Sequence, residues 1–297
     1  MLPNTFILGY PKSGTTALAA LLSQHQEIFI PLKKEPRFFQ FKDEAPDIHD
    51  PVNKNVITSI DDYKSLYYNK DEKILIDASP GYILSSTAIR NIKSSVPNAK
   101  IILFLRDPIE RAYSHYLFAI QKGFEPDISF KECLDTPERF VGQYKRTTNY
   151  VAESQYKLHL TKLFNVFDPN VVYINTTEQF QHNQQEVLQE INEFLDLEHF
   201  IYSLDIGEKA KSGIPKSKAL NGILKNLKSL RKSLPSFLKT DKMKKIFQNV
   251  ANSNLSKPEM DLEVKLQLMS KFSEDIEFLK NINVDVSLWR NFNSASN

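Results

Sequence analysis

The sequence predicts an α/β fold in which a central, mainly parallel sheet has helices on both faces. Four short apolar runs are each followed by a polar loop and then by a helical pattern. This alternation is typical of parallel sheets, because consecutive parallel strands need a crossover connection that is usually a helix. A glycine-bounded turn follows the first run, and 41% of the 297 residues are hydrophobic, which is enough for a substantial core.

The predicted strands indicate where ligands gather. The carboxyl ends of parallel strands share one edge of the sheet, and ligands bind outside that edge. The residues directly after each strand are therefore the first candidates for a site. The strands are predicted at residues 5–9, 73–76, 100–105 and 171–175, and residues 153–167 are predicted to form a helix that packs on the sheet.

The turn after the first strand has the spacing of a phosphate-binding loop. Gly9 and Gly14 keep the G-x-x-x-x-G arrangement, which lets backbone N–H groups close around an anion at a helix N-terminus. The lysine that follows the second glycine in ATP-binding loops is absent, because Thr15 stands there and Lys12 lies inside the turn. We therefore expect a three-layer, P-loop-like fold whose loop binds an anion other than an ATP triphosphate.

Arg106 and Ser114 predict a second phosphate site after the third strand. A guanidinium at the end of a central strand is costly in a core and well shaped for bidentate contact with phosphate. Ser114 lies on the face of the following helix that begins at this edge. Asp107 and Glu110 have a structural explanation as the helix N-cap and its capping-box partner, with Pro108 as the first helical residue, so they are given no catalytic role.

The composition argues against several classes of protein. A net charge of +2 is too small to predict nucleic-acid binding by the whole chain. Cys133 is the only cysteine and the six histidines show no metal-ligand spacing, so we expect neither a disulfide framework nor a protein-bound metal. No signal sequence and no apolar run of spanning length is recognisable, so we expect a cytoplasmic protein without a transmembrane segment.

We expect a single domain over residues 1–297, with an α/β core at 1–205, a basic lid and helix at 206–250, and a helical C-terminal part at 251–297. The extension is lysine-rich: residues 209–245 contain twelve Lys or Arg and one acid. From Leu220 onward, leucines recur at helical spacing between lysines. This helix either packs its leucines on the core, which we favour, or lies on a membrane or over a ligand.

Together these segments resemble the sulfotransferase family that uses 3′-phosphoadenosine-5′-phosphosulfate (PAPS). Residues 10–16 resemble its 5′-phosphosulfate loop, and residues 106–114 resemble its 3′-phosphate-binding strand and helix. Residues 34–39, Lys-Glu-Pro-Arg-Phe-Phe, are similar to the Lys-Glu-Pro-His-Phe-Phe segment of bacterial members and to the corresponding segment of heparan sulfate sulfotransferases. Residues 211–217 resemble the lid that closes over the nucleotide. The four segments occur in the expected order and cover most of the chain.

The resemblance implies in-line transfer of a sulfuryl group from PAPS to an acceptor hydroxyl or amine, with adenosine 3′,5′-bisphosphate as the product and no metal. It implies that Glu35 is the general base and that Lys12 stabilises the leaving phosphate. Taken without the resemblance, Glu35 is a surface carboxylate neutralised by Lys33 and Lys34. The implied nucleotide-binding residues are Pro11, Lys12, Ser13, Gly14, Thr15 and Thr16 in the loop, Arg106 and Ser114 after the third strand, and Ser212, Gly213 and Lys216 in the lid.

Arg37, Phe38 and Ser79 are the predicted acceptor-binding residues. Arg37 stands where related sequences often carry His, which favours attraction of an anionic acceptor over an acid–base role. Phe38 and its neighbouring phenylalanines either pack in the core or form a wall of the acceptor cleft. Ala78 stands where glycosaminoglycan O-sulfotransferases tend to have Lys, so the sequence does not support a heparan-like acceptor.

Two other classes of function stay open on the sequence alone. A P-loop kinase needs magnesium and a carboxylate, for which Asp77 is the candidate, but the missing loop lysine counts against it. A non-catalytic nucleotide-binding protein would use the lysine-rich helix to meet a membrane or an acidic partner. His115 is interpreted as a structural helix residue rather than a base. The acceptor stays open among carbohydrates, lipids and small molecules, as do O- versus N-sulfation and the oligomeric state.

Overall fold

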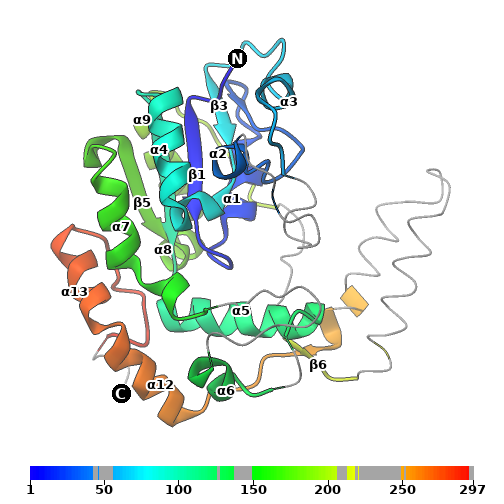
Figure 1. Cartoon of the computed structure of the whole chain (residues 1–297), viewed down its shortest axis with the longest axis vertical. Coiled ribbons are helices and arrows are strands. Elements are labelled where there is room, and N and C mark those ends of the chain that lie inside the picture. Colours follow the sequence, from blue (N-terminus) through cyan, green and yellow to red (C-terminus); the bar gives the residue numbers. More distant parts are fainter. Residues whose placement is uncertain are drawn as a thin grey trace.

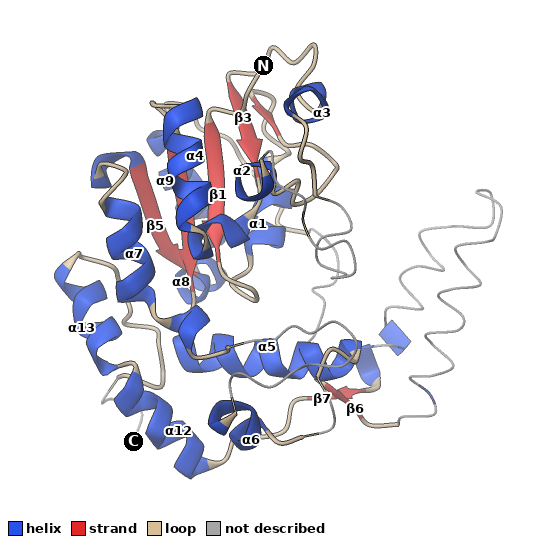
Figure 2. Ribbon diagram, viewed as in Figure 1, coloured by secondary structure: helices blue, strands red, loops and turns tan. Residues whose placement is uncertain are grey.

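A five-stranded sheet forms the centre of the molecule, in the order β2-β3-β1-β4-β5, and every neighbouring pair is parallel (Figures 1 and 2). The structure is a computed structural model that describes residues 1–42, 46, 56–125, 128–136, 149–205, 213–217, 220, 249–250 and 252–293. The strands are β1 (Thr5–Gly9), β2 (Ile28–Phe29), β3 (Ile74–Asp77), β4 (Lys100–Leu105) and β5 (Val172–Thr176).

The central strands β1 and β4 are apolar because both of their faces are covered. Successive side chains of a strand point to opposite faces, and Phe6 and Leu8 lie in one core cluster while Ile7 lies in another. The register pairs Thr5 with Lys100 and Gly9 with Phe104. The loops that leave β1 and β4 therefore start side by side at the same edge of the sheet.

Helices cover both faces of the sheet and give three layers (Figure 1). The first face packs against one large cluster that includes Tyr63, Leu160 and Leu279. The helices of this layer are α2 (Phe38–Phe41), α3 (Ile60–Ser65), α4 (Ser86–Ser95), α7 (Tyr156–Phe164) and α13 (Ser273–Asn281). The second face is covered by α1 (Thr15–Leu22), α8 (Thr177–His182) and α9 (Gln184–Phe194).

A third cluster lies below the carboxyl edge of the sheet and is built around α5 (Pro108–Lys122), with α6 (Phe130–Asp135) and α12 (Leu262–Lys271) packed against it. Helix α5 begins where the sequence predicts: the Asp107 carboxylate accepts hydrogen bonds from the N–H groups of Ile109 and Glu110, at 3.0 and 3.2 Å. It ends at Gly123, whose φ of 75° suits glycine. Short 3₁₀ turns link the larger elements: η2 (Pro80–Leu84), η4 (Ala152–Ser154) and η5 (Pro169–Val171).

The described C-terminal residues complete this architecture. The short strands β6 (Ile214–Pro215) and β7 (Leu255–Ser256) pair antiparallel beside α5. Helices α12 and α13 follow β7, and the buried Trp289 beyond them belongs to the same cluster as the first face of the sheet. Within the described residues, no helix is long and apolar enough to cross a bilayer.

The expected α/β class, with its mainly parallel sheet, is confirmed, and all four predicted strands are present within one residue of their predicted ends. The fifth strand, β2, was not predicted. Residues 153–167 do not form one helix, because η4 and α7 meet at Gln155. The lysine-rich helix predicted beyond Leu220 lies outside the described residues.

Candidate active site

The loop between β1 and α1 forms a cradle at the carboxyl edge of the sheet. Lys12 and Gly14 both have a φ of 77°, in the left-handed region, which glycine adopts readily and lysine rarely does. A β-carbon at Gly9 would lie 2.9 Å from Thr15 Cγ2 and 3.1 Å from the Phe104 carbonyl oxygen, so only glycine lets β1 run this close to β4 and α1. The predicted glycine spacing therefore has a steric cause at both ends of the loop.

The cradle presents donors suited to an anion. The Ser13 N–H donates to the Tyr10 carbonyl at 3.1 Å and closes the turn. The Ser13 hydroxyl is buried and has no hydrogen-bond partner among the described residues. The first N–H groups of α1 have no partner within the helix, and the helix dipole places partial positive charge there. A buried hydroxyl that has no partner within the described ranges, beside such a helix end, suits an anion-binding loop.

Lys12 supplies the positive charge of the cradle. Its ammonium lies 4.8 Å from the centre of the Phe118 ring, on α5. Burial, together with the nearby charges of Arg106 and Lys122, lowers the pKa of Lys12 from its ordinary value to about 8. Three cations thus converge on this loop, and an anion bound there would relieve their mutual repulsion.

Three side chains from distant elements fix the cradle backbone. Arg106 donates to the Lys12 carbonyl at 3.0 Å, and its guanidinium also lies 3.7 Å from Glu110 and 3.9 Å from Glu178. The fully buried Arg111 donates to the Pro11 carbonyl at 3.4 Å. No role was predicted for Arg111, although it stands in the segment that follows the third predicted strand.

The third of these side chains is Thr177, at the start of α8. Its hydroxyl lies between the carbonyl oxygens of Ser13 and Leu105, at 3.0 and 2.8 Å, and so ties the loop to the end of β4. Its methyl group would lie 3.5 Å from a β-carbon at Gly14. The position of Thr177 directly after the fourth predicted strand was the only sequence signal for this contact.

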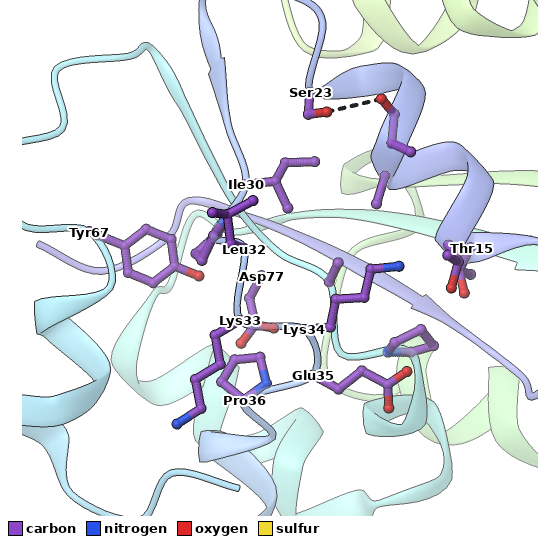
Figure 3. Close-up of a pocket in the computed structure, with 16 residues that line it drawn as sticks. Thr15, Ser23, Ile30, Leu32, Lys33, Lys34, Glu35, Pro36, Tyr67 and Asp77 are labelled. Carbon is purple, nitrogen blue, oxygen red and sulfur yellow. Dashed lines mark hydrogen bonds between the residues drawn. The ribbon is translucent and has the colours of Figure 1, made fainter. Parts of the chain in front are cut away.

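A pocket of about 230 Å³ opens beside the cradle, lined by 16 residues (Figure 3). Its walls come from the exposed side of α1, the chain between β2 and α2, and the end of β3. Apolar lining residues such as Ile30, Pro31 and Ala78 form much of the surface, and Thr15 and Glu35 provide polar groups. In Figure 3 the Glu35 carboxylate extends to the side on which Thr15 lies, away from the ammonium group of Lys33. The predicted base therefore shares one pocket with Thr15 and Thr16, the last two residues of the cradle.

A family model for the sulfotransferase domain matches residues 2–260. The chain belongs to the sulfotransferase family.

The curated relatives of this sulfotransferase domain are longer proteins, and the chain matches only a part of each. The chain is 25% identical over 217 residues to the bifunctional heparan sulfate N-deacetylase/N-sulfotransferase 1 of Caenorhabditis briggsae, which is 69% of this chain and 24% of that protein. It is 34% identical over 124 residues to the membrane-associated sulfotransferase kil1 of Dictyostelium discoideum, 40% of this chain and 24% of that protein. It is 24% identical over 222 residues to the heparan sulfate glucosamine 3-O-sulfotransferase 3A1 of Mus musculus, 74% of this chain and 52% of that protein. The matched part is thus about a quarter to a half of each relative's length.

A solved structure supports the sulfotransferase fold over nearly the whole chain. The sulfotransferase from Alicyclobacillus acidocaldarius superposes with a TM-score of 0.72 at 24% identity and covers 98% of this chain and 99% of that chain. At this identity the likeness concerns the fold alone.

Within this sulfotransferase domain, the described nucleotide-binding candidates outside the lid lie in the cradle and on the segment from the end of β4 into α5. Pro11 to Thr16 form the cradle, and Arg106 touches it. Ser114 lies buried on α5, with 5% of its surface exposed. Asp107 is the predicted N-cap, but Glu110 forms no capping box: its carboxylate instead pairs with Lys257 at 2.6 Å. Ser212 lies outside the described residues.

The described part of the lid, residues 213–217, forms strand β6 and the turn after it. A β-carbon at Gly213 would lie 2.5 Å from the Ser256 carbonyl oxygen, so the pairing of β6 with β7 requires glycine there. The Lys216 N–H donates to the Asn254 carbonyl at 2.7 Å, and the Lys216 side chain is exposed. The lid backbone is therefore anchored on the strand that follows the lysine-rich segment.

The three predicted acceptor-binding residues have different surroundings. The Arg37 guanidinium is half-buried and donates to Gln40 Oε1 at 2.8 Å. Phe38 is 1% exposed and stacks on Tyr63, with ring centres 4.4 Å apart. Ser79 is fully buried and donates to Asp77 Oδ1 at 2.6 Å. Phe38 and Ser79 are inaccessible in this structure, so a direct contact with an acceptor would require rearrangement.

Proposed function

We propose that the chain transfers a sulfuryl group from PAPS to a hydroxyl or amine of an acceptor that enters the pocket beside the cradle. The observation that carries the proposal is the cradle itself: the loop before α1 holds Lys12 and a buried Ser13 hydroxyl that has no partner in the part of the chain that the structure describes, in a chain of the sulfotransferase family. The loop lacks the trailing lysine that an ATP-binding loop uses.

The proposed nucleotide carries two separate phosphate groups. Lys12, the Ser13 hydroxyl and the first N–H groups of α1 would hold the 5′-phosphate side. Arg106 and Ser114, with Ser212, Gly213 and Lys216 of the lid, would hold the 3′-phosphate. When bound, PAPS supplies an activated sulfuryl group whose leaving group is a phosphate.

Glu35 is the proposed general base. Its carboxylate removes the proton from the acceptor hydroxyl or amine as the acceptor atom forms its bond to sulfur and the bond between sulfur and the phosphate oxygen breaks. The Lys12 ammonium lies in the loop where the leaving phosphate gains charge, and a well-placed donor of this kind contributes about 3 to 4 kcal/mol to transition-state stabilisation. No step of this scheme uses a protein-bound metal.

The pocket favours an acceptor with an apolar part next to its reacting group. Ile30 and Pro31 line it on one side and Ala78 on the other, and no lysine follows β3. The relatives named for heparan sulfate make a carbohydrate acceptor a second candidate class.

A transfer assay with labelled PAPS tests this function. The acceptor panel is 2-naphthol, a long-chain alcohol, an aliphatic amine and a glucosamine oligosaccharide. We expect transfer to at least one of them, a loss of at least 100-fold in kcat for Glu35→Gln, and retained binding of adenosine 3′,5′-bisphosphate by that variant. Full activity of Glu35→Gln with the accepted substrate would show that Glu35 is not the base.

The surroundings of Asp77 disfavour the kinase alternative. The Asp77 carboxylate is fully buried and accepts hydrogen bonds from the hydroxyls of Tyr63, Ser79 and Tyr82, at 2.6, 2.6 and 2.9 Å. Burial raises its pKa above the ordinary value. A magnesium ligand at this position would have to give up these bonds, so Asp77 is better explained as a structural group.

A further inference from the structure

We propose that Asp77, acting through the hydroxyls of Ser79 and Tyr82, is a positioning residue that holds the Glu35 turn against the pocket. The Glu35 turn is defined as residues 35–39. The hydrogen bonds of this network are present in the structure. Only their expected effect on catalysis rests on the function proposed above.

The Glu35 turn has a backbone that needs outside support. Glu35 and Arg37 both have a φ of 51°, and neither is glycine. Left-handed residues other than glycine are strained, and such strain persists only where the surrounding structure fixes it. The Glu35 side chain is exposed, so its own packing does not fix its direction. The rings of Phe38 and Phe39 are buried and anchor the end of the turn, but the left-handed backbone at Glu35 and Arg37 needs support of its own.

Two hydroxyl groups supply this support, and both connect the turn to one buried carboxylate. The Ser79 hydroxyl accepts from the Arg37 N–H at 3.2 Å and donates to Asp77 Oδ1 at 2.6 Å. The Tyr82 hydroxyl accepts from the Phe39 N–H at 3.3 Å and donates to Asp77 Oδ2 at 2.9 Å. Asp77, Ser79 and Tyr82 are all fully buried. Each oxygen of Asp77 thus anchors one N–H group of the turn through one hydroxyl.

The direction of these hydrogen bonds explains why a carboxylate is needed. A hydroxyl has a single proton, and donating it to Asp77 leaves the oxygen lone pairs directed at the N–H groups of the turn. An ionised carboxylate accepts on both oxygens, whereas an amide would offer an N–H₂ group to one of the two hydroxyls. Asp77 therefore sets the polarity of both connections, and its position at the end of β3 ties the base-bearing turn to the central sheet.

Two further contacts hold the same segment from outside this network. The Pro36 carbonyl accepts from the Ile57 N–H at 2.8 Å, and the Phe39 carbonyl accepts from Asn91 Nδ2 at 3.0 Å. Neither contact uses the amide of Arg37 or Phe39, which donate to Ser79 and Tyr82. Loss of either hydroxyl should therefore loosen the turn without unfolding it.

Hydrogen exchange of the full-length chain tests the network directly. Ser79→Ala should speed exchange of the Arg37 amide at least tenfold and leave the cradle at residues 9–16 unchanged, and Ser79→Thr, which keeps the hydroxyl, should restore slow exchange. Tyr63→Phe is the matched control, because it removes a hydroxyl from the same carboxylate but no bond to the turn. Equal exchange of Arg37 in wild type and Ser79→Ala would overturn the proposal. If Ser79→Ala does not fold, Tyr82→Phe carries the same test at the Phe39 amide.

The network should also affect catalysis, by lowering kcat while leaving the KM for PAPS nearly unchanged. With labelled PAPS and the panel acceptor that wild type uses, Ser79→Ala should lower kcat at least tenfold, with the KM for PAPS within twofold, and Tyr63→Phe should keep kcat within twofold. Equal losses of kcat in Ser79→Ala and Tyr63→Phe would show a general structural effect and contradict the positioning role. If wild type transfers to no panel member, the proposed function fails while the exchange experiment still decides the network.

Discussion

Lys12 is partly buried and supplies the positive charge of the cradle. An ammonium with a pKa of about 8 is protonated at neutral pH but loses its charge within the range of ordinary assays. An anion in the cradle would favour the protonated form, because opposite charge stabilises it. The affinity of the cradle for an anion should therefore depend on pH in a way that an arginine would abolish.

We predict that adenosine 3′,5′-bisphosphate binds more weakly as the pH rises above about 8, the pKa of Lys12 in the free protein. The dissociation constant should increase by up to about tenfold for each pH unit above that value. Lys12→Arg should remove this dependence, because arginine stays charged throughout the range. Titration calorimetry from pH 7 to 9.5 measures both proteins. Equal pH slopes in wild type and Lys12→Arg would exclude Lys12 as the titrating group.

His159 is the second residue whose titration has a consequence. It is 8% exposed and packs near the Tyr10 ring, and its Nδ1 has no hydrogen-bond partner in the described part of the chain. Burial lowers its pKa to about 4, and the charge of Lys162 acts in the same direction. Between that value and the ordinary value of 6.5, the unfolded chain binds a proton that the native protein does not.

We therefore predict that the free energy of unfolding falls as the pH drops from about 6.5 to about 4, because of His159. Above pH 6.5 His159 is neutral in both the native and the unfolded chain and causes no loss. The loss should approach about 3 kcal/mol at the acid end. His159→Leu should have a flatter dependence of unfolding free energy on pH, measured by urea denaturation between pH 7 and 4.5. A variant with the same slope as wild type would contradict the assignment.

At the scale of elements, four of the five strands of the central sheet could be predicted from the sequence, whereas β2 and the long-range contacts of the cradle could not. Residues 5–9 and 100–105 are continuous apolar runs because both faces are buried, and this pattern is visible in sequence. β2 has only Ile28 and Phe29, too few residues to show a period. The cradle was recognised from its glycines, but the contact of Arg111 with Pro11 joins residues 100 positions apart, which no local pattern reveals.

The lid hairpin gives a test at this scale. We predict that Gly213→Ala separates β6 from β7, because the new β-carbon would lie 2.5 Å from the Ser256 carbonyl oxygen. Overpacking of this kind costs about 1 to 3 kcal/mol, which should speed exchange of the Lys216 amide several-fold or more. Gly81→Ala is the matched control, because among the described residues no atom beyond its two chain neighbours lies within 4 Å of the added β-carbon. Unchanged exchange at Lys216 in Gly213→Ala would show that the hairpin tolerates the extra carbon.

At the scale of the whole molecule, the described C-terminal residues pack into the core on the first face of the sheet. Trp289 is fully buried, and its indole N–H donates to Glu178 at 2.9 Å. Glu178 in turn lies 3.9 Å from the Arg106 guanidinium, so the C-terminal part is linked to the edge of the sheet that carries the cradle. The single domain over residues 1–297 stays a prediction, which an unfolding experiment tests.

We predict one cooperative urea transition for the chain and a loss of about 3 to 5 kcal/mol in unfolding free energy for Trp289→Ala. Trp289→Phe keeps most of the ring and should lose about 1 to 3 kcal/mol, chiefly because Glu178 is left without its indole donor. Two separate transitions, with only one of them shifted by Trp289→Ala, would indicate that the C-terminal part folds as an independent unit.

The cradle is proposed to accept a nucleotide with separate 3′- and 5′-phosphates rather than a triphosphate. Calorimetric titration of the full chain with adenosine 3′,5′-bisphosphate, without magnesium, tests it most directly, with ATP plus magnesium as the comparison ligand. We predict binding of the bisphosphate by wild type, a loss of at least tenfold in affinity for Lys12→Ala, and no comparable binding of ATP. Binding of magnesium-ATP together with no heat from the bisphosphate would contradict the account.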